Sequence, residues 1–466
     1  MLTGPENAGL VGLFVAVAAL TVTESKRAGL RAGNPAALYT TLWAALILAL
    51  QFSFFHVAPL TLQTWALLLV GSGGFMVGSI VGVISGGRSP GGEVRYEDSR
   101  LARMQRVLIV ALAAYVVFES ARVLPVLHTV GGIGAILGGG EAGGQYRHLL
   151  VSASIASSEA DFSQGSFVLG LLGYLLFVLG TLSLVWGGYF VLKRRWLLAV
   201  TPLILNAVLS LVTLQRSSFV YSLALFGFSA AYFRRWRNQD RVRSRRHYAI
   251  YAFLAAALVI VVVVPLSLRG PGVSKLTTVQ SVTGYAISGV VALNAKVESD
   301  PLWRQPPVID PGVSAPVPGL GVYTFHGLTT VLDRLHVPVP NSPANFDYAV
   351  VSIFGKPFYS NVFTWLIYFK YDLGWIGVAL GPMLIALFAM RVDLAIMKRG
   401  SMRLVPVGAI LMTTILMSFF GLTLLRDVRY TLVAIVGAFI EPMLRDRGLS
   451  QGENGEAAGS YVGGIS

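Results

Sequence analysis

The sequence predicts an all-α polytopic membrane protein, and three observations carry this prediction. Of the 466 residues, 55% are hydrophobic and only 12% are charged, and the mean hydropathy is +0.68. Soluble proteins carry about 25% charged residues. The apolar residues also gather in runs near the length that a membrane-spanning helix needs, about 20 residues. The chain contains no cysteine, which excludes disulfides, thiolate metal sites and cysteine nucleophiles.

About eleven apolar runs are expected to span the bilayer. They lie near residues 8–22, 35–55, 60–85, 107–124, 165–190, 196–214, 217–233, 248–268, 372–391, 404–423 and 428–443. The apolar stretch 361–371 is too short to span, and we interpret it as a re-entrant or interfacial piece that leads into the ninth span. We expect one membrane domain over residues 1–447, followed by a polar, disordered tail over 448–466.

The basic residues predict the orientation. Loops after the odd-numbered spans carry 24 of the 36 lysines and arginines. Because short cytoplasmic loops are enriched in these residues, we expect these loops and the C-terminus in the cytoplasm and the N-terminus outside. The net charge of +14 then lies at the inner face, where it favours anionic lipid and requires no nucleic-acid partner.

Two expected external segments are too long to be simple connectors. The first, about 124–165, is rich in glycine, and the second, about 269–360, contains a proline-rich stretch at 306–318. Within the second segment, residues 281–297 and 324–335 are predicted as short helices on the membrane face. Long structured loops commonly carry function, so both segments are candidate parts of a site.

Cations at the outer membrane edge are the first candidates for chemistry, because charges there are costly. Arg216 is a lone cation at the junction of two spans, where its planar fork suits a phosphate or pyrophosphate; helix-end anchoring is the structural alternative. In the last outer turn, Arg426 and Arg429 are three residues apart and are expected to share a helix face, while Asp427 holds one of them in place. The other outer arginines in the candidate set are Arg147, Arg269, Arg304 and Arg334.

Three further groups complete the candidate set. His326 could act as a general base on a sugar hydroxyl, or could be a packed structural histidine. Asp372 begins the expected ninth span, where its carboxylate could cap the helix. Glu119 and Arg122 are three residues apart on the fourth span and are predicted to form an ion pair. The six scattered histidines lack the spacing of metal ligands, so we expect neither a metal nor a cofactor.

Several stretches of the sequence carry a family resemblance. The most specific is Asn361–Gly377, where an Asn-x-x-Thr pair is followed by a tyrosine, an Asp-x-Gly and a second glycine. Others are SVTGYAISGVVALN, GLGVYTFHGLTTVLDRL and the closing LLRD. Together with the many spans and the two long external loops, they resemble the O-antigen polymerase, or oligosaccharide repeat-unit polymerase, family (Wzy-type). Arg216 and Gly227 also have the eleven-residue spacing described for some members. The resemblance covers roughly residues 200–430 in recognisable words.

The resemblance implies a metal-independent, GT-C-like glycosyltransferase in the bacterial inner membrane, with its active site facing the periplasm. It would transfer a growing glycan from undecaprenyl pyrophosphate to a new lipid-linked repeat unit. Arg216 and Arg429 would stabilise the charge of the leaving pyrophosphate, and His326 would act as the base. The residues that would bind pyrophosphate or glycan are Arg147, Arg269, Arg304, Arg334, Arg426, Asn361 and Asp372.

The implied partners are the lipid-linked oligosaccharide, membrane lipid and, as a candidate, a chain-length regulator protein. Other functions stay open at this stage. An O-antigen ligase or another lipid-dependent glycosyltransferase would use the same arginines with a different acceptor. A flippase or transporter would place charges and broken helices near the bilayer midplane. A non-catalytic assembly partner is the remaining alternative.

Overall fold

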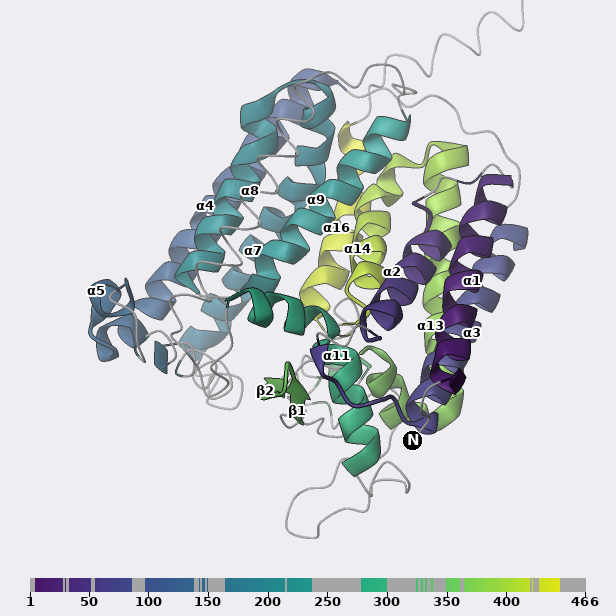
Figure 1. The fold of residues 1–466 in the computed structure, drawn as a ribbon. Helices are drawn as coiled ribbons and strands as arrows, with labels where there is room; N and C mark the ends of the chain where they lie inside the picture. The colour runs from purple at the N-terminus through teal and green to yellow at the C-terminus, as the bar shows by residue number, and fades with distance from the viewer. Residues whose placement is uncertain are drawn as a thin grey trace, which may run out of the picture.

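The computed structural model describes most of the chain and shows it to be mainly helical (Figure 1). The described residues are 5–27, 33–51, 55–85, 97–137, 164–213, 216–236, 278–299, 349–360, 364–419 and 427–444, with a few single positions between them. The helices are α1 (Pro5–Arg27), α2 (Pro35–Ala49), α3 (Leu62–Ser85), α4 (Asp98–Thr129), α5 (Gly132–Leu137), α7 (Gln164–Leu192), α8 (Trp196–Val212), α9 (Arg216–Trp236), α11 (Thr278–Ser299), α13 (Leu366–Arg399), α14 (Val405–Leu416) and α16 (Val428–Leu444), and the strands are β1 (Ala349–Ile353) and β2 (Lys356–Ser360).

Five helices in the described ranges are long and apolar enough to cross a membrane. They cover Asn7–Arg27, Leu62–Ser85, Asp98–Thr129, Val168–Leu192 and Leu366–Lys398. Shorter apolar helices cover Pro35–Ala49, Trp196–Val212, Met402–Leu416 and Val428–Ile440. The expectation of a mostly helical membrane protein is confirmed in this form. The expected span over 248–268 lies outside the described residues. Helix α4 is longer than the span expected at 107–124, because the helix continues beyond its apolar run at both ends.

The helices stand side by side in one bundle. In Figure 1, α4, α7 and α8 form one side, α1, α2, α3 and α13 form the other, and α9, α14 and α16 lie between them. We call the end of the bundle at which α1 begins the outer end, because the N-terminus is expected outside. Helices α5 and α11 and the strand pair β1–β2 lie at this end (Figure 1).

Helices α3 and α13 pack closely because α3 presents glycines to α13. A β-carbon on Gly74 would collide with the backbone carbonyl of Ala379, and one on Gly78 with that of Met383. One turn further, a β-carbon on Gly82 would lie 2.7 Å from the β-carbon of Met390. Because the residue numbers of the contacting pairs increase along both helices in the same order, α3 and α13 run in the same direction.

Helix α13 is interrupted at Gly374, where φ is 61° and ψ is −145°. The stretch before the break, Leu366–Leu373, is called the half-helix below. Its Phe369 ring packs on Gly381, although in one straight helix these residues would be about 18 Å apart along the axis. The half-helix therefore lies beside the next part of α13. This confirms a separate short piece before the ninth span, and the structure buries it inside the bundle.

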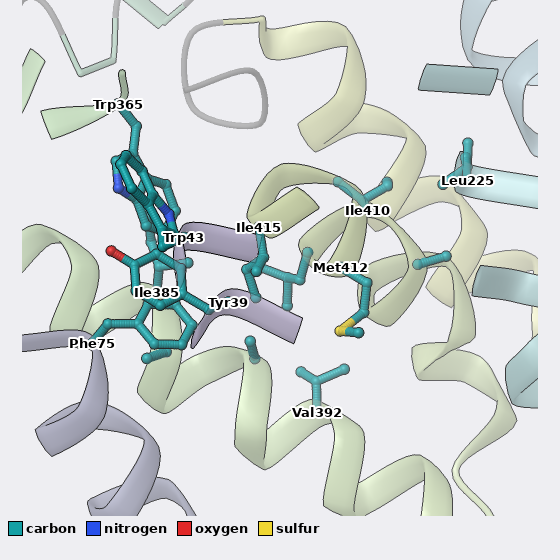
Figure 2. Close-up of a cluster of buried hydrophobic side chains, with 14 of the residues drawn as sticks. Tyr39, Trp43, Phe75, Leu225, Trp365, Ile385, Val392, Ile410, Met412 and Ile415 are labelled. Carbon is teal, nitrogen blue, oxygen red and sulfur yellow. The ribbon is translucent and has the colours of Figure 1, made fainter. Parts of the chain in front are cut away.

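Trp365, the residue just before the half-helix, lies deep among aromatic side chains (Figure 2). The Trp365 ring lies 5.7 Å from Tyr39 and 6.1 Å from Phe75, measured between ring centroids. Its backbone N–H donates to the carbonyl of Ser418, 2.8 Å away, and the Ser418 hydroxyl accepts from the indole of Trp43 at 2.9 Å. A backbone N–H at the start of the half-helix and a backbone carbonyl just after α14 thus form a hydrogen bond with each other within the apolar core.

The second long external segment contains more regular structure than predicted. Helix α11 is expected on the membrane face, yet Val290, Ala292 and Leu293 are fully buried, and a β-carbon on Gly289 would collide with the carbonyl of Phe419. The antiparallel pair β1–β2 is a departure from the all-α prediction. Its turn reaches the connection between α2 and α3, where the Phe354 N–H donates to the Phe55 carbonyl at 2.6 Å.

At the opposite end, polar contacts join helix ends that were all expected in the cytoplasm. The Lys193 ammonium, after α7, lies 2.8 Å from Asp98 at the start of α4, and the Tyr189 hydroxyl donates to the same carboxylate at 2.9 Å. Arg391 donates to the Ser85 hydroxyl at 3.0 Å. The expected grouping of these loops agrees with the structure; which face of the membrane they occupy stays a prediction.

Candidate functional site

Arg429 is held in a fixed orientation at the outer end of α16. Its Nε lies 2.9 Å and its Nη2 2.7 Å from the two carboxylate oxygens of Asp427. Asp427 also accepts from the backbone N–H of Arg429 at 3.0 Å, as a helix-capping aspartate does. The predicted role of Asp427 in holding an arginine is confirmed. Among the described residues no hydrogen-bond partner is found for Nη1, so this nitrogen can donate to a further acceptor.

Aromatic rings from three other helices surround this arginine. The Arg429 guanidinium carbon lies 4.5 Å from the centre of the Phe177 ring on α7, a distance at which a cation and a ring attract. Phe177 meets Tyr115 of α4 and Tyr430 edge to face, at 5.6 and 5.5 Å. Tyr430 in turn lies 6.1 Å from Tyr221 of α9. We call Asp427, Arg429 and these four rings the outer arginine cluster.

The predicted Glu119–Arg122 pair borders this cluster. The two side chains are 3.5 Å apart, and Tyr115, one turn before Glu119, is within electrostatic reach of Glu119, Arg122, Asp427 and Arg429. Glu119 is 17% exposed and Arg122 51% exposed. The structure therefore brings opposite charges from α4 and α16 to one region, although their positions in the sequence are about 300 residues apart.

Arg216 is the first residue of α9. Tyr221 follows it by five residues, or about 7.5 Å along a helix axis, and belongs to the outer arginine cluster. The backbone of Arg216 therefore starts a helix that contacts the cluster. Its side chain lies outside what the structure describes, so the role of the guanidinium stays a prediction.

Asp372 is buried near the break in α13, two residues before Gly374, and its predicted capping role stays a prediction. It lies within the half-helix, and its carboxylate accepts from the backbone N–H of Thr324 at 2.6 Å. The carboxylate thus anchors part of the second external segment to the half-helix. The ninth span was expected to begin at residue 372, and the part of α13 after the break begins close to this position.

The remaining candidates lie outside the described residues, and their roles stay predictions: Arg147, Arg269, Arg304, His326, Arg334, Asn361 and Arg426. The shared helix face expected for Arg426 and Arg429 depends on one of these residues, so it stays a prediction as well. In the described ranges no three potential metal-ligating side chains gather in one place.

Two cavities lie between α1, α2 and α3. The first is a half-open groove of about 330 Å³, whose lining is mostly apolar and includes Phe14, Tyr39, Trp43 and Met76. The second, about 180 Å³, lies at the outer end of the same helices and is lined by Asn7, Gln51 and His56 together with the loop that leads to α3. A groove of this kind can hold an apolar chain.

The sequence did not indicate the four rings of the outer arginine cluster. They come from α4, α7, α9 and α16, and only packing brings them together. Two local signals were present: Tyr430 is adjacent to Arg429, and Tyr115 precedes Glu119 by one helical turn.

Comparison of the chain with protein-family models, curated proteins and solved structures finds no match.

Proposed function

We propose that this protein is a polysaccharide polymerase of the O-antigen type, which joins lipid-linked oligosaccharide repeat units at the outer face of a bacterial inner membrane. The observation that carries the proposal is the orientation of Arg429. Asp427 holds its guanidinium against the ring of Phe177, at the outer end of a bundle of apolar helices. A preoriented guanidinium at the membrane edge suits a lipid-linked pyrophosphate, because its fork matches phosphate oxygens.

In the proposed reaction, a hydroxyl of the acceptor repeat unit attacks the anomeric carbon of the donor sugar. The bond from that carbon to the pyrophosphate oxygen breaks, and its electron pair stays on the pyrophosphate. Arg429 would stabilise this charge, which costs little reorganisation because Asp427 already holds the guanidinium. The Arg216 side chain, at the start of a neighbouring helix, is the second candidate for this task.

The finer parts of the proposal extend beyond the described residues. We propose about eleven spans, a GT-C-like arrangement and an N-terminus outside the cell. The groove between α1, α2 and α3 is a candidate site for the tail of a lipid-linked substrate. His326 and the arginines of the external segments would complete the site around the sugars. The lipid-linked oligosaccharide is the substrate, and a chain-length regulator is a candidate partner.

The test is a turnover assay in nanodiscs with one synthetic undecaprenyl-pyrophosphate oligosaccharide, run with a chelator. We expect a ladder of longer glycans from the wild type. Arg429→Gln should lower turnover by ~100-fold or more, the loss typical when a charge-stabilising donor is removed. Arg429→Lys should recover only part of it, because the ammonium has no fork. Arg100→Gln is the matched control, since Arg100 also pairs with a nearby carboxylate but at the opposite end of the bundle.

No ladder from the wild type would contradict the polymerase. Transfer of the glycan to an added lipid A core acceptor would then support a ligase.

The break in α13 favours a second candidate, a flippase or transporter. Interrupted helices are typical of transporters, and here the buried carboxylate of Asp372 lies next to the break. Export of a labelled lipid-linked oligosaccharide across proteoliposomes, without elongation of its glycan, would support this candidate over the polymerase.

A further inference from the structure

Glu119 is a shielded carboxylate whose task the proposed reaction leaves open. Its side chain is 17% exposed, and its ion pair with Arg122 is 3.5 Å long. Charge-assisted hydrogen bonds between such groups are shorter, about 2.7–2.9 Å. In the described part of the chain neither carboxylate oxygen of Glu119 has a hydrogen bond. A carboxylate that is shielded from water but not tightly bound can accept a proton.

The position of Glu119 relative to Arg429 follows from the packing of α4. Tyr115 of α4 lies at the level of Phe177, which contacts the Arg429 guanidinium. Helix α4 runs toward the outer end, since it leads into α5 there (Figure 1). Glu119 follows Tyr115 by four residues, so its backbone lies about 6 Å further out along α4 than that of Tyr115, whose ring contacts Phe177.

This order matches the order of groups in a lipid-linked sugar. The lipid tail lies in the bilayer, the pyrophosphate lies at its edge, and the sugar and the attacking hydroxyl lie beyond the pyrophosphate. With the pyrophosphate on Arg429, the anomeric carbon and the acceptor hydroxyl are on the outer side, where Glu119 lies.

We propose that Glu119, in place of His326, is the general base of the reaction, an inference that rests on the proposed function. The acceptor hydroxyl gives its proton to the Glu119 carboxylate as its oxygen bonds to the anomeric carbon. The carbon–oxygen bond to the pyrophosphate breaks, and the pyrophosphate leaves with the electron pair. The proton then passes from Glu119 to solvent.

The experiment uses the full-length protein in nanodiscs with the synthetic lipid-linked oligosaccharide. Glu119→Gln should lower turnover by ~100-fold or more, as general bases contribute 10²- to 10⁴-fold. Its affinity for the donor should stay within about twofold, because the base does not hold the pyrophosphate. Glu97→Gln is the matched control. Glu97 directly precedes α4 and forms the same kind of pair with Arg100, at the end of α4 that lies away from the outer arginine cluster.

Two further variants separate a base from a structural ion pair. Arg122→Gln removes the pair but keeps the carboxylate, so a base predicts turnover within about threefold of wild type, given the weak energy of such pairs. A purely structural pair predicts equal losses for Arg122→Gln and Glu119→Gln. In Glu119→Ala, added formate should restore part of the turnover, and it should leave Arg429→Gln unchanged.

The outcomes are distinguishable. If the wild type does not elongate the glycan, the proposed function fails and takes this inference with it. If the wild type elongates and Glu119→Gln keeps turnover within about threefold of Glu97→Gln, only the base is overturned, since that loss is far below the range of general bases. Equal losses in Glu119→Gln and Arg122→Gln, with no rescue by formate, overturn it as well.

Discussion

Replacing Gly78 by alanine should loosen the contact between α3 and α13, and the structure gives the size of the effect. A β-carbon there would lie 2.7 Å from the carbonyl carbon of Met383 and 2.9 Å from its Cα. Ordinary contacts begin near 3.4 Å, and the carbonyl oxygen of Met383 lies closer than either of these atoms, so the helices must separate by more than about 0.7 Å. All three obstructing atoms are backbone atoms, which cannot turn aside. Overpacking of this kind costs about 1–3 kcal/mol.

Gly73→Ala is the matched control on the same helix. No atom lies within 4 Å of a β-carbon at Gly73, so this variant gains the helix propensity of alanine, up to about 1 kcal/mol, without the collision. Comparing the two variants cancels the propensity, and Gly78→Ala should be less stable by ~1–3 kcal/mol. Unfolding with SDS in mixed micelles measures this difference. Equal free energies of unfolding for the two variants would refute the packing argument.

Three other predictions concern stability and use the same titration. Gly374→Ala should cost ~1–3 kcal/mol, because φ 61° and ψ −145° suit only glycine and no neighbouring atom adds a steric term; an unchanged stability would contradict this backbone argument. Trp43→Phe should cost ~1–2 kcal/mol by removing the donor to the Ser418 hydroxyl, and adding Ser418→Ala should then cost less than it does alone. Lys193→Gln should cost less than ~1 kcal/mol, since its pair with Asp98 is partly exposed, and the loss should shrink at about 1 M salt; a salt-independent loss would point to packing.

The helical membrane fold could be predicted from the sequence because long apolar runs leave few alternatives. The local reading of Asp427 also agreed with the structure, since a capping aspartate next to an arginine is a short-range pattern. The break at Gly374 was only partly foreseen. The apolar stretch before it was seen to be too short for a span, but its burial depends on Tyr39, Phe75 and Ser418, which are distant in the sequence.

Neither the strand pair β1–β2 nor the rings of the outer arginine cluster could be predicted from the sequence, and the two reasons differ. The segment 349–360 carries only a Phe-Gly turn between short strands, a weak local signal inside a long loop. The rings around Arg429 come from four helices, and no single-helix pattern links Phe177 with Tyr430. The contact of Asp372 with Thr324 was not anticipated, because the two residues are 48 positions apart and only packing brings them together.

The hydrogen bond from Trp365 to Ser418 has a consequence for biosynthesis. The half-helix is too short to insert as a span, and the acceptor for its first N–H group belongs to a segment that is synthesised later. The half-helix can therefore reach its final packed position only after α14 has been synthesised. A chain that ends at Gly400 should expose Trp365 to protease, whereas the complete chain should protect it. Insertion of this protein is thus expected to finish by the docking of an already synthesised segment rather than strictly in order from the N-terminus.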